Sequence, residues 1–496
     1  MIWDFVLQAL SPYILLITLA GVSLGIVWGA MPGLSTTMAM ALLIGLSAGM
    51  DQNTALSFML GVYTGSVFGG AISAVMINIP GTPDAVPTMI EGHQLARRGE
   101  GGQALGMAIG ASFIGNWVGI ILLIGFIPLI LTFALHFRSW EMFLLAVIGI
   151  SVSGSMSAGS LPLKGWIAGW IGLLVAFVGV DSMHAVPRFT FGILELQDGI
   201  NYIAVLIGLF GLAEVLRVLP QRDHYTIPTE VGRVVPSFRM LARHSKAAVR
   251  SGIIGTLIGA IPGAGANVAS FLAYDIGRRR AKPEEKAKWG KGSYEAIVSA
   301  EVANNANIGG SMLPMLALGI PGNAAAAALM AALTLKNVVV GPTIETDHPG
   351  LIYFIYTALI VANLLMYGAA IMLIKPCVKL FSLPRGLLLP LIIPICVIGA
   401  YAIRLSMFDV WVMFASGLVG YVLHAFRFPT APIVLGVILG PLADENFRRS
   451  MYLFEDRSIG FVLSQYVGTV LLIVIGFIFI EGIVRIRRDR QNHQEA

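Results

Sequence analysis

Four Pro-Gly pairs interrupt apolar segments of this chain, and small hydroxyl, amide or acidic residues follow each pair. Pro removes a backbone donor and Gly loosens a helix, so within lipid each interruption must face protein or water. Ser, Thr, Asn and Asp are preferred at helix N-caps, and Pro suits the first helical turn. Each interruption, called a break below, therefore predicts the start of a new half-helix.

We expect the four half-helix N-termini to converge near the middle of the membrane. Unpaired N–H groups and the positive end of the helix dipole bind anions, especially carboxylates and phosphates, so an anionic substrate fits best. A single break would favour a plain packing kink, whereas four symmetric breaks favour a ligand site. The candidate substrate-binding residues are Gly33, Ser35, Thr36, Thr37, Asn78, Gly81, Thr82, Gly263, Asn267, Gly322 and Asn323.

A second polar cluster precedes the fourth break, where Glu301, Asn304 and Asn305 have the i, i+3, i+4 spacing of one helix face. An acid inside a membrane is costly and is a candidate for cation or proton handling. Glutamate and asparagine oxygens suit Na⁺, while a partly desolvated Glu suits a proton, so both coupling ions stay open. Two plainer explanations also stay open: Glu301 is solvated at the cytoplasmic end of its helix, and Asp84 is an ordinary helix-start acid.

Signals for enzymatic chemistry are weak. The His residues have no metal-ligand spacing, no Gly-rich loop carries a P-loop lysine, and no nucleophile lies in a catalytic elbow motif. Cys377 and Cys396 have no paired spacing that would indicate a disulfide or a thiolate site. We therefore predict a non-enzyme without an organic cofactor or resident metal, since a membrane-embedded enzyme would have to rely on Glu301 and its Asn neighbours.

The composition places these residues in lipid. Hydrophobic residues make up 56% of the 496-residue chain and charged residues 12%, and apolar runs of roughly 17 to 25 residues, the length that crosses a bilayer, recur from Ser11 to Ile483. The first ten residues carry Asp4 and lack Lys and Arg, so we expect them to belong to the mature protein. Nucleic-acid binding receives no support.

An internal repeat relates the breaks. The segment 29–33 (GAMPG) matches 259–263 (GAIPG), and Gly-Gly leading to 79–82 (IPGT) matches Gly-Gly leading to 320–323 (IPGN). The predicted divisions are repeat 1 at 11–216, a basic linker at 217–247, repeat 2 at 248–458, and an extra span with a basic tail at 459–496. In this alignment Glu301, Asn304 and Asn305 correspond to Gly61, Thr64 and Gly65, so the acid is present in one repeat only.

Loop charges predict that the two repeats are inverted, because cytoplasmic loops retain Lys and Arg. The loop after the third break is rich in Arg and Lys, whereas its counterpart after the first break carries Asp51. Arg97 and Arg98 follow the second break, but Glu345 and Asp347 follow the fourth. We therefore expect a periplasmic N-terminus, a cytoplasmic linker and a cytoplasmic C-terminus.

The predicted fold is an all-α polytopic membrane protein with two inverted-topology repeats. Each repeat has a re-entrant or broken-helix hairpin and about five crossings, and one C-terminal span follows, which gives about 11 crossings and 2 hairpins. The hairpins are expected at 12–49 and 251–277. The crossings are expected at 54–78, 104–134, 142–157, 163–180, 200–216, 295–320, 350–374, 386–401, 409–424, 430–442 and 460–484.

These motifs closely resemble those of the TctA-type large membrane subunit of the tripartite tricarboxylate transporter (TTT) family, and the resemblance runs nearly end to end. The residues that carry it are 29–37, 78–83, Glu91-Gly92 to Gly99-Glu100, 259–267 and 292–323. The resemblance implies a secondary carrier of the bacterial inner membrane that takes up di- and tricarboxylates such as citrate by symport with Na⁺ or H⁺.

The resemblance also implies two partners, a small four-span TctB-type membrane subunit and a periplasmic TctC-type solute-binding protein that delivers the substrate. It fits an elevator-like motion of the domain that holds the hairpins. Two alternatives stay open: a carboxylate or anion channel, which would use the same helix termini without accumulating substrate, and a stand-alone carrier that needs no binding protein.

Overall fold

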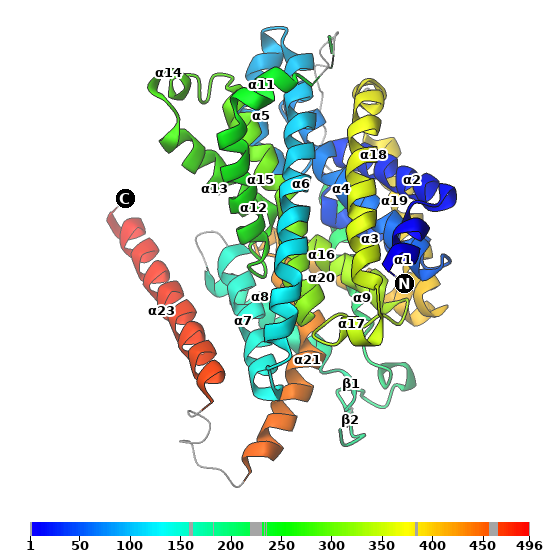
Figure 1. The fold of residues 1–496 in the computed structure, drawn as a ribbon. Coiled ribbons are helices and arrows are strands. Elements are labelled where there is room, and N and C mark those ends of the chain that lie inside the picture. The colour runs from blue at the N-terminus through cyan, green and yellow to red at the C-terminus, as the bar shows by residue number, and fades with distance from the viewer. Residues whose placement is uncertain are drawn as a thin grey trace.

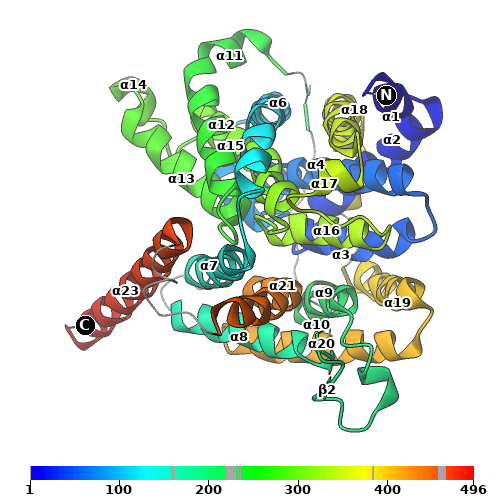
Figure 2. The ribbon, with the colours of Figure 1, turned by 60° about the horizontal axis from the view of Figure 1, so that its bottom comes forward.

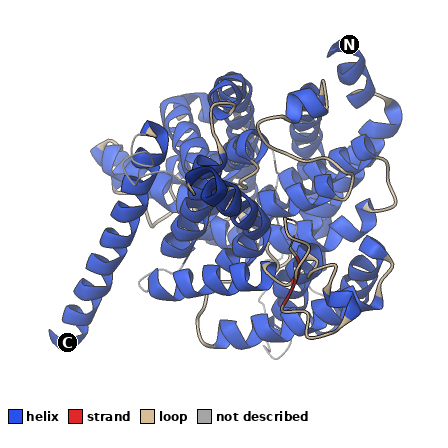
Figure 3. Ribbon diagram, turned by 90° about the horizontal axis from the view of Figure 1, so that it is seen from below, coloured by secondary structure: helices blue, strands red, loops and turns tan. Residues whose placement is uncertain are grey.

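The computed structural model describes residues 2–157, 162–181, 183–218, 231–232, 234, 236–381, 385–455 and 465–495. Most of these residues are helical (Figure 3), and the chain is an all-α polytopic membrane protein. Seven helices of the described chain are long and apolar enough to cross a membrane. They are α2 (Pro12–Ala30), α4 (Gln52–Ile77), α6 (Gly101–Ala134), α7 (Ser139–Ser157), α18 (Leu351–Leu380), α20 (Met407–Ala425) and the Val467–Val484 part of α23 (Tyr466–Glu495).

Shorter apolar helices lie among them: α3 (Thr36–Ser47), α8 (Pro162–Ala176), α16 (Ala324–Thr334) and the Ile392–Arg404 part of α19 (Arg385–Arg404). The other helices are α1 (Ile2–Ala9), η1 (Pro83–Ala85), α5 (Val86–Arg97), η2 (Leu194–Leu196), α9 (Tyr202–Leu206), the π-helical η3 (Ile207–Leu212), α10 (Ala213–Val218), α11 (Phe238–Arg243), α12 (Ser245–Gly259), α13 (Gly265–Arg280), α14 (Pro283–Lys286), α15 (Tyr294–Leu318), α17 (Ile344–Asp347) and α21 (Ala431–Phe454). Strands β1 (Gly179–Val180) and β2 (Pro187–Arg188) form a small antiparallel hairpin in which Gly179 pairs with Arg188.

Among the described residues, helices cover most of each predicted crossing, although strand β1 ends the segment 163–180 and not all of the helices are long and apolar. Helix α15 is long enough to cross yet carries Glu301 and three Asn residues, while α21 becomes charged in its second half. The number of crossings and the inversion of the repeats therefore stay predictions. Of the predicted linker 217–247, residues 219–230, 233 and 235 lie outside the described residues, as do 456–464 ahead of the last span.

Helices from the two predicted repeats exchange partners. Helix α6 packs mainly against α15, whereas α18 packs mainly against α4 and α2. The same exchange occurs elsewhere in the molecule, where α21 lies on α7 and α8 (Figures 1 and 2). In the same region η3 lies on α19 and α20. Each half is thus completed by helices of the other.

Backbone lies directly on backbone between α2 and α4. A Cβ atom added to Gly21, Gly25 or Gly29 would lie 2.2 to 2.5 Å from a carbonyl oxygen of α4, and one added to Gly61, Gly65 or Gly69 would lie 2.3 to 2.6 Å from a carbonyl oxygen of α2. Small residues spaced four apart allow this approach. The contact continues to Gly29, so it fixes the position of the first break.

We expect Gly25→Ala to destabilise the protein by about 1–3 kcal/mol, because its Cβ would lie 2.5 Å from the carbonyl oxygen of Val62. The measurement is thermal unfolding of the purified protein in detergent. Gly125→Ala in α6 is the matched control, since a Cβ there has open space and gains the same helix propensity. Equal melting temperatures for the two variants would contradict the close contact.

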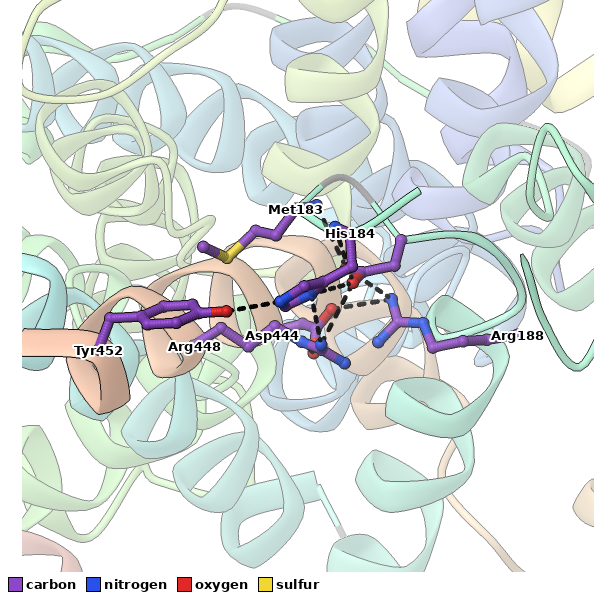
Figure 4. A network of polar contacts seen from close by, with 7 residues as sticks. Met183, His184, Arg188, Asp444, Arg448 and Tyr452 are labelled. Atoms are coloured by element: carbon purple, nitrogen blue, oxygen red, sulfur yellow. Dashed lines mark hydrogen bonds and ion pairs between the residues drawn. The ribbon is translucent and has the colours of Figure 1, made fainter. Parts of the chain in front are cut away.

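An ion-pair network ties the β1–β2 loop to the end of α21 (Figure 4). The Asp181 carboxylate accepts hydrogen bonds from the backbone N–H of Met183 at 3.4 Å and of His184 at 3.2 Å. His184 Nδ1 lies 2.9 Å from this carboxylate, and Arg448 Nη1 donates to it at 3.2 Å. Asp181 is 2% exposed, so these partners replace water.

Two further contacts complete this network. Asp444 accepts from Arg448 at 3.0 Å and pairs with Arg188 at 2.8 Å, so both arginines bridge acids of the loop and of α21. The Tyr452 hydroxyl lies 2.6 Å from His184 Nε2. The loop is thereby held to one face of α21.

The hydrogen bond from His184 is the main reason why the pKa of Asp181 lies below its ordinary value of 3.8. A lowered pKa means that this stabilisation is present above pH 3.8 and is lost as the pH falls through the lower value of the folded protein. We expect protease cleavage within the loop of liposome-embedded protein to stay slow at neutral pH and to accelerate below about pH 4. Asp181→Asn should be cleaved quickly already at pH 7, whereas Glu195→Gln, which changes an exposed acid of η2 beyond the loop, should match the wild type; equal rates for both variants would contradict the network.

Candidate functional site

The two breaks of the first half touch each other. The first separates α2 from α3, and the second separates α4 from η1 and α5. A Cβ on Gly81 would lie 2.1 Å from the carbonyl oxygen of Gly29, and the Gly81 N–H donates to the carbonyl of Gly70 at 3.3 Å. Only a residue without a side chain fits this position without displacing the backbone of the first break.

The second half repeats the arrangement. A Cβ on Gly322 would lie 2.2 Å from the carbonyl oxygen of Gly259, the Gly322 N–H donates to Ser311 at 3.1 Å, and the Gly263 N–H donates to Gly322 at 2.8 Å. The halves then meet, because α16 after the fourth break packs on α3 after the first, and η1 after the second packs on α13 after the third. All four breaks are therefore gathered in one region.

Each break starts a helix, as predicted, but the predicted cap residues act in only two cases. Ser35 Oγ accepts from the N–H of Met38 at 3.1 Å, and Asn323 Oδ1 accepts from the N–H of Ala326 at 2.8 Å. Thr82 precedes η1 without a side-chain cap. Asn267 does not cap α13, because the helix already begins at Gly265, two residues earlier.

A buried hydrogen-bond network joins the fourth break to both halves. Asn323 Nδ2 lies 2.9 Å from the hydroxyl of Tyr63 in α4 and 2.8 Å from Asn307 Oδ1 in α15. The Tyr63 hydroxyl also lies 3.0 Å from Ser311 Oγ. Asn307 and Ser311 belong to the second half and Tyr63 to the first, so Asn323 links the start of α16 to both.

Glu301 is completely buried in a second network. Thr88 of α5 donates to Oε1 at 2.6 Å, and Ser112 of α6 donates to Oε2 at 3.2 Å. Asn305 Nδ2 donates to Ser112 Oγ at 2.8 Å. The explanation that Glu301 is solvated at a helix end is therefore wrong, since neutral side chains of the protein replace its water.

Between these networks lies a group of buried polar atoms that make no hydrogen bond of normal geometry with the described residues. They are Thr82 Oγ1, Asp84 Oδ2, both side-chain polar atoms of Asn304, and Asn305 Oδ1. The Asp84 carboxyl lies beside Asn304 and Thr82, and its charge acts on both Tyr63 and Glu301. Because buried polar atoms are normally paired, this group, called the polar centre below, has the composition of a ligand site.

The other predicted substrate residues are placed less uniformly. Thr36 is buried and its Oγ1 has no partner among the described residues, and Thr37 is partly buried. Gly33 adopts φ +85° at the first break and faces Val218. Asn78 and Asn267 are exposed, and Asn78 has a left-handed conformation that ends α4.

Sequence reasoning missed Tyr63, Thr88 and Ser112, and it left Asp84 undecided. The sequence shows each of them only as a polar residue in a segment whose other residues are mostly apolar or small. Thr88 follows Asp84 by four residues and so lies one turn further along the same chain segment. No spacing, however, relates Tyr63 or Ser112 to Asn323 or Glu301.

A buried carboxylate positions the helix that carries Thr88. Glu91 of α5 is 0% exposed and accepts hydrogen bonds from the Tyr274 hydroxyl at 2.7 Å and the Gly290 N–H at 2.6 Å. The N–H groups of Gly292 and Ser293 each donate to its other oxygen at 2.9 Å. Glu91 therefore lies at the N-terminus of α15, where the helix dipole favours an anion.

Comparison with known proteins agrees with this architecture. The model of the tripartite tricarboxylate transporter TctA family matches residues 15–435. The chain belongs to this TctA family. Membership makes it a component of a tricarboxylate transporter, and a family of transporters implies no enzymatic activity of its own.

Two relatives of this TctA-family chain come from Agrobacterium vitis. An uncharacterized 52.8 kDa protein in the TAR-I ttuC' 3' region is 34% identical over 487 residues, covering 97% of this chain and 96% of the relative. An uncharacterized protein in the TAR-II ttuC' 3' region is 35% identical over 217 residues, covering 44% of this chain and 89% of the relative. A crystal structure of the Eremococcus coleocola manganese transporter aligns over 95% of both chains at 12% identity, with a TM-score of 0.12.

We expect Glu91→Ala to destabilise the protein by about 3 kcal/mol or more, because four donors would lose one charged acceptor. The measurement is thermal unfolding in detergent, together with the yield of monodisperse protein. Glu284→Ala removes an exposed acid of α14 and should leave both unchanged. A Glu91→Ala protein as stable as the Glu284→Ala protein would contradict the positioning role.

Proposed function

We propose that this TctA-family chain carries di- and tricarboxylates such as citrate across the bacterial inner membrane by secondary active uptake. Na⁺ or H⁺ moves with the substrate, a periplasmic TctC-type binding protein delivers it, and a small TctB-type membrane subunit assists. Family membership supports the substrate class and the tripartite setting. The polar centre between the four breaks is the observation that carries the mechanism.

The breaks supply the means to bind a carboxylate. Helices α3 and α16 begin at capped N-termini, and η1 begins beside the unpartnered Thr82 hydroxyl. Free N–H groups and hydroxyls at helix starts stabilise anions without a buried fixed cation. The substrate is proposed to bind between these starts, with Ser35, Thr36, Thr37, Thr82 and Asn323 closest to it.

The same geometry explains why uptake would need a cation. A substrate carboxylate at Thr82 lies next to Asp84, whose charge already acts on Glu301. Like charges at short range in a buried site repel strongly, so the substrate binds well only after a cation or proton neutralises this pair. Each ligand then raises the affinity for the other by the same factor, which is the thermodynamic basis of symport.

Sodium is the favoured coupling ion. Unpartnered oxygens of Thr82, Asp84, Asn304 and Asn305 lie in the polar centre beside the Glu301 carboxylate. Carboxylate, amide and hydroxyl oxygens are the ligands that hard cations take. A proton would need only the two carboxyl groups and would leave the amide oxygens without a role.

Two inverted repeats and a cytoplasmic C-terminus complete the proposal. The exchanged helix pairs support a pseudo-symmetric arrangement of 11–216 and 248–458. Side-chain contacts join loops that the inverted topology assigns to one side: Lys164 Nζ donates to the carbonyl of Phe426, Arg98 to that of Lys291, and Lys336 to that of Ala48. All three contacts agree with a topology in which the helices cross the membrane fully and the N-terminus is periplasmic.

The test is uptake of radiolabelled citrate into proteoliposomes that contain the chain, both partners and an imposed gradient. We expect accumulation under a Na⁺ gradient, and a loss of about tenfold or more in Glu301→Gln and in Asp84→Asn, since each removes one negative charge in or beside the polar centre. Glu345→Gln changes an exposed loop acid and should transport like the wild type.

The outcomes separate the competing functions. Accumulation driven by a pH gradient without Na⁺ would replace sodium by a proton, and accumulation without the binding protein would indicate a stand-alone carrier. Equilibration of citrate without accumulation under either gradient would indicate a channel. Wild-type accumulation by both variants would leave the carrier function intact and refute the assigned coupling site.

A further inference from the structure

A groove of about 710 Å³ lies between α12 and α13, the two helices that flank the third break. It is remote in sequence and in lining from the polar centre, with which it shares no residue. Figures 1 and 2 show α12 and α13 on the outer face of the molecule, beside α14. One part of the groove is basic, with Lys246, Arg250 and Arg280, and the rest is apolar, with Val249, Ile253 and Ile276.

The basic part has more positive than negative charge among the described residues. Arg250 Nε and Nη2 are shielded from solvent and have no hydrogen-bond partner among the described residues. Glu295 is the acid whose charge acts on Arg250, but its carboxylate also lies 3.7 Å from His244 Nδ1. Three cations therefore face one carboxylate that already has a partner, and the unpartnered guanidinium N–H groups fit the oxygens of a phosphate.

The apolar part continues along α12 as an exposed stripe. Val249, Ile253 and Leu257 follow one another at intervals of four residues along α12 and are 53%, 43% and 59% exposed, and Ile261, 37% exposed, follows just after the end of the helix. From Val249 to Leu257 the helix rises about 12 Å, which is close to the half-thickness of a bilayer core, about 15 Å. A free phosphate or a soluble anion would make no apolar contact with this stripe, whereas a lipid acyl chain would pack against it.

We propose that this groove binds an anionic phospholipid. The phosphate lies on the Arg250 guanidinium between Lys246 and Arg280, and an acyl chain follows the stripe from Val249 toward Ile261. Basic pockets at the membrane boundary recognise anionic headgroups in this way. The cytoplasmic leaflet as the source of the lipid rests on the proposed topology, but the binding site does not.

The bound lipid would act on the hairpin that holds the third break. Helix α12 ends at Gly259, whose carbonyl oxygen touches the position of Gly322, and α13 begins at Gly265. A lipid that spans both helices fixes their separation just ahead of the contact between the third and fourth breaks. The expected consequence is a higher thermal stability of the protein in the presence of anionic lipid.

The experiment measures lipid binding to the purified full-length chain by native mass spectrometry and by thermal shift. The probes are phosphatidylglycerol, phosphatidylcholine of the same acyl chains, and glycerol phosphate. We expect phosphatidylglycerol to bind and stabilise the protein more than phosphatidylcholine does. Each removed cation should weaken phosphatidylglycerol binding about fivefold, which corresponds to about 1 kcal/mol per Lys or Arg.

Lys246→Gln is the first variant, because Lys246 is exposed and its loss leaves folding intact. The double variant Lys246→Gln with Arg250→Gln should bind phosphatidylglycerol about 25-fold more weakly than the wild type. Arg279→Gln is the matched control, since Arg279 lies on the same helix as Arg280 but is 76% exposed and pairs with Asp275. Leu257→Ser removes part of the apolar stripe, so it should weaken the binding of long-chain phosphatidylglycerol. The preference for an anionic headgroup should stay unchanged.

Three results would overturn the proposal. The first is equal binding of phosphatidylglycerol and phosphatidylcholine, and the second is equal binding by Lys246→Gln and Arg279→Gln. The third is displacement of the lipid by glycerol phosphate, which would make the groove a phosphate site. Loss of bound phosphatidylglycerol when the small membrane subunit is added would instead assign the groove to that protein.

Discussion

The whole arrangement depends on one constraint: a helix broken inside a membrane must find partners for its freed backbone within the protein. Here the partner of one break is another break. The Gly29 carbonyl lies against Gly81, the Gly259 carbonyl lies against Gly322, and the N–H of Gly263 binds the carbonyl of Gly322. Once the breaks are paired in this way, the helix starts that follow them are brought together, and the polar centre forms where they meet.

Sequence patterns predicted the breaks, the helical class, and two caps, because each depends on a few neighbouring residues. The repeat alignment also placed Glu301 opposite Gly61, and the structure gives the reason. Gly61 and Gly65 lie against carbonyl oxygens of α2 at distances that leave no room for a side chain. The first half uses these positions for backbone contact, so only the second half can carry the acid.

Other parts of the site could not be read from local patterns. Thr88 and Ser112 reach Glu301 from α5 and α6, and Tyr63 reaches Asn323 from α4, so each pairing depends on how helices of the two halves pack. Asn267 was misplaced for a local reason: Gly263 and Gly265, with φ of +78° and +70°, make the turn and let α13 begin early. Tertiary packing therefore explains the missed pairings, and glycine conformation explains the early start of α13.

The exchange of helices between the halves has a consequence for biogenesis. Helices α2 and α4 leave the ribosome early, but α18, which covers them, is synthesised only after the whole of the linker and α15. At ordinary synthesis rates this delay is on the order of tens of seconds. During that time the face of α4 that α18 covers and the hydroxyl of Tyr63 lack their contacts from the second half, so both stay open to lipid or to the insertion machinery until synthesis is almost complete.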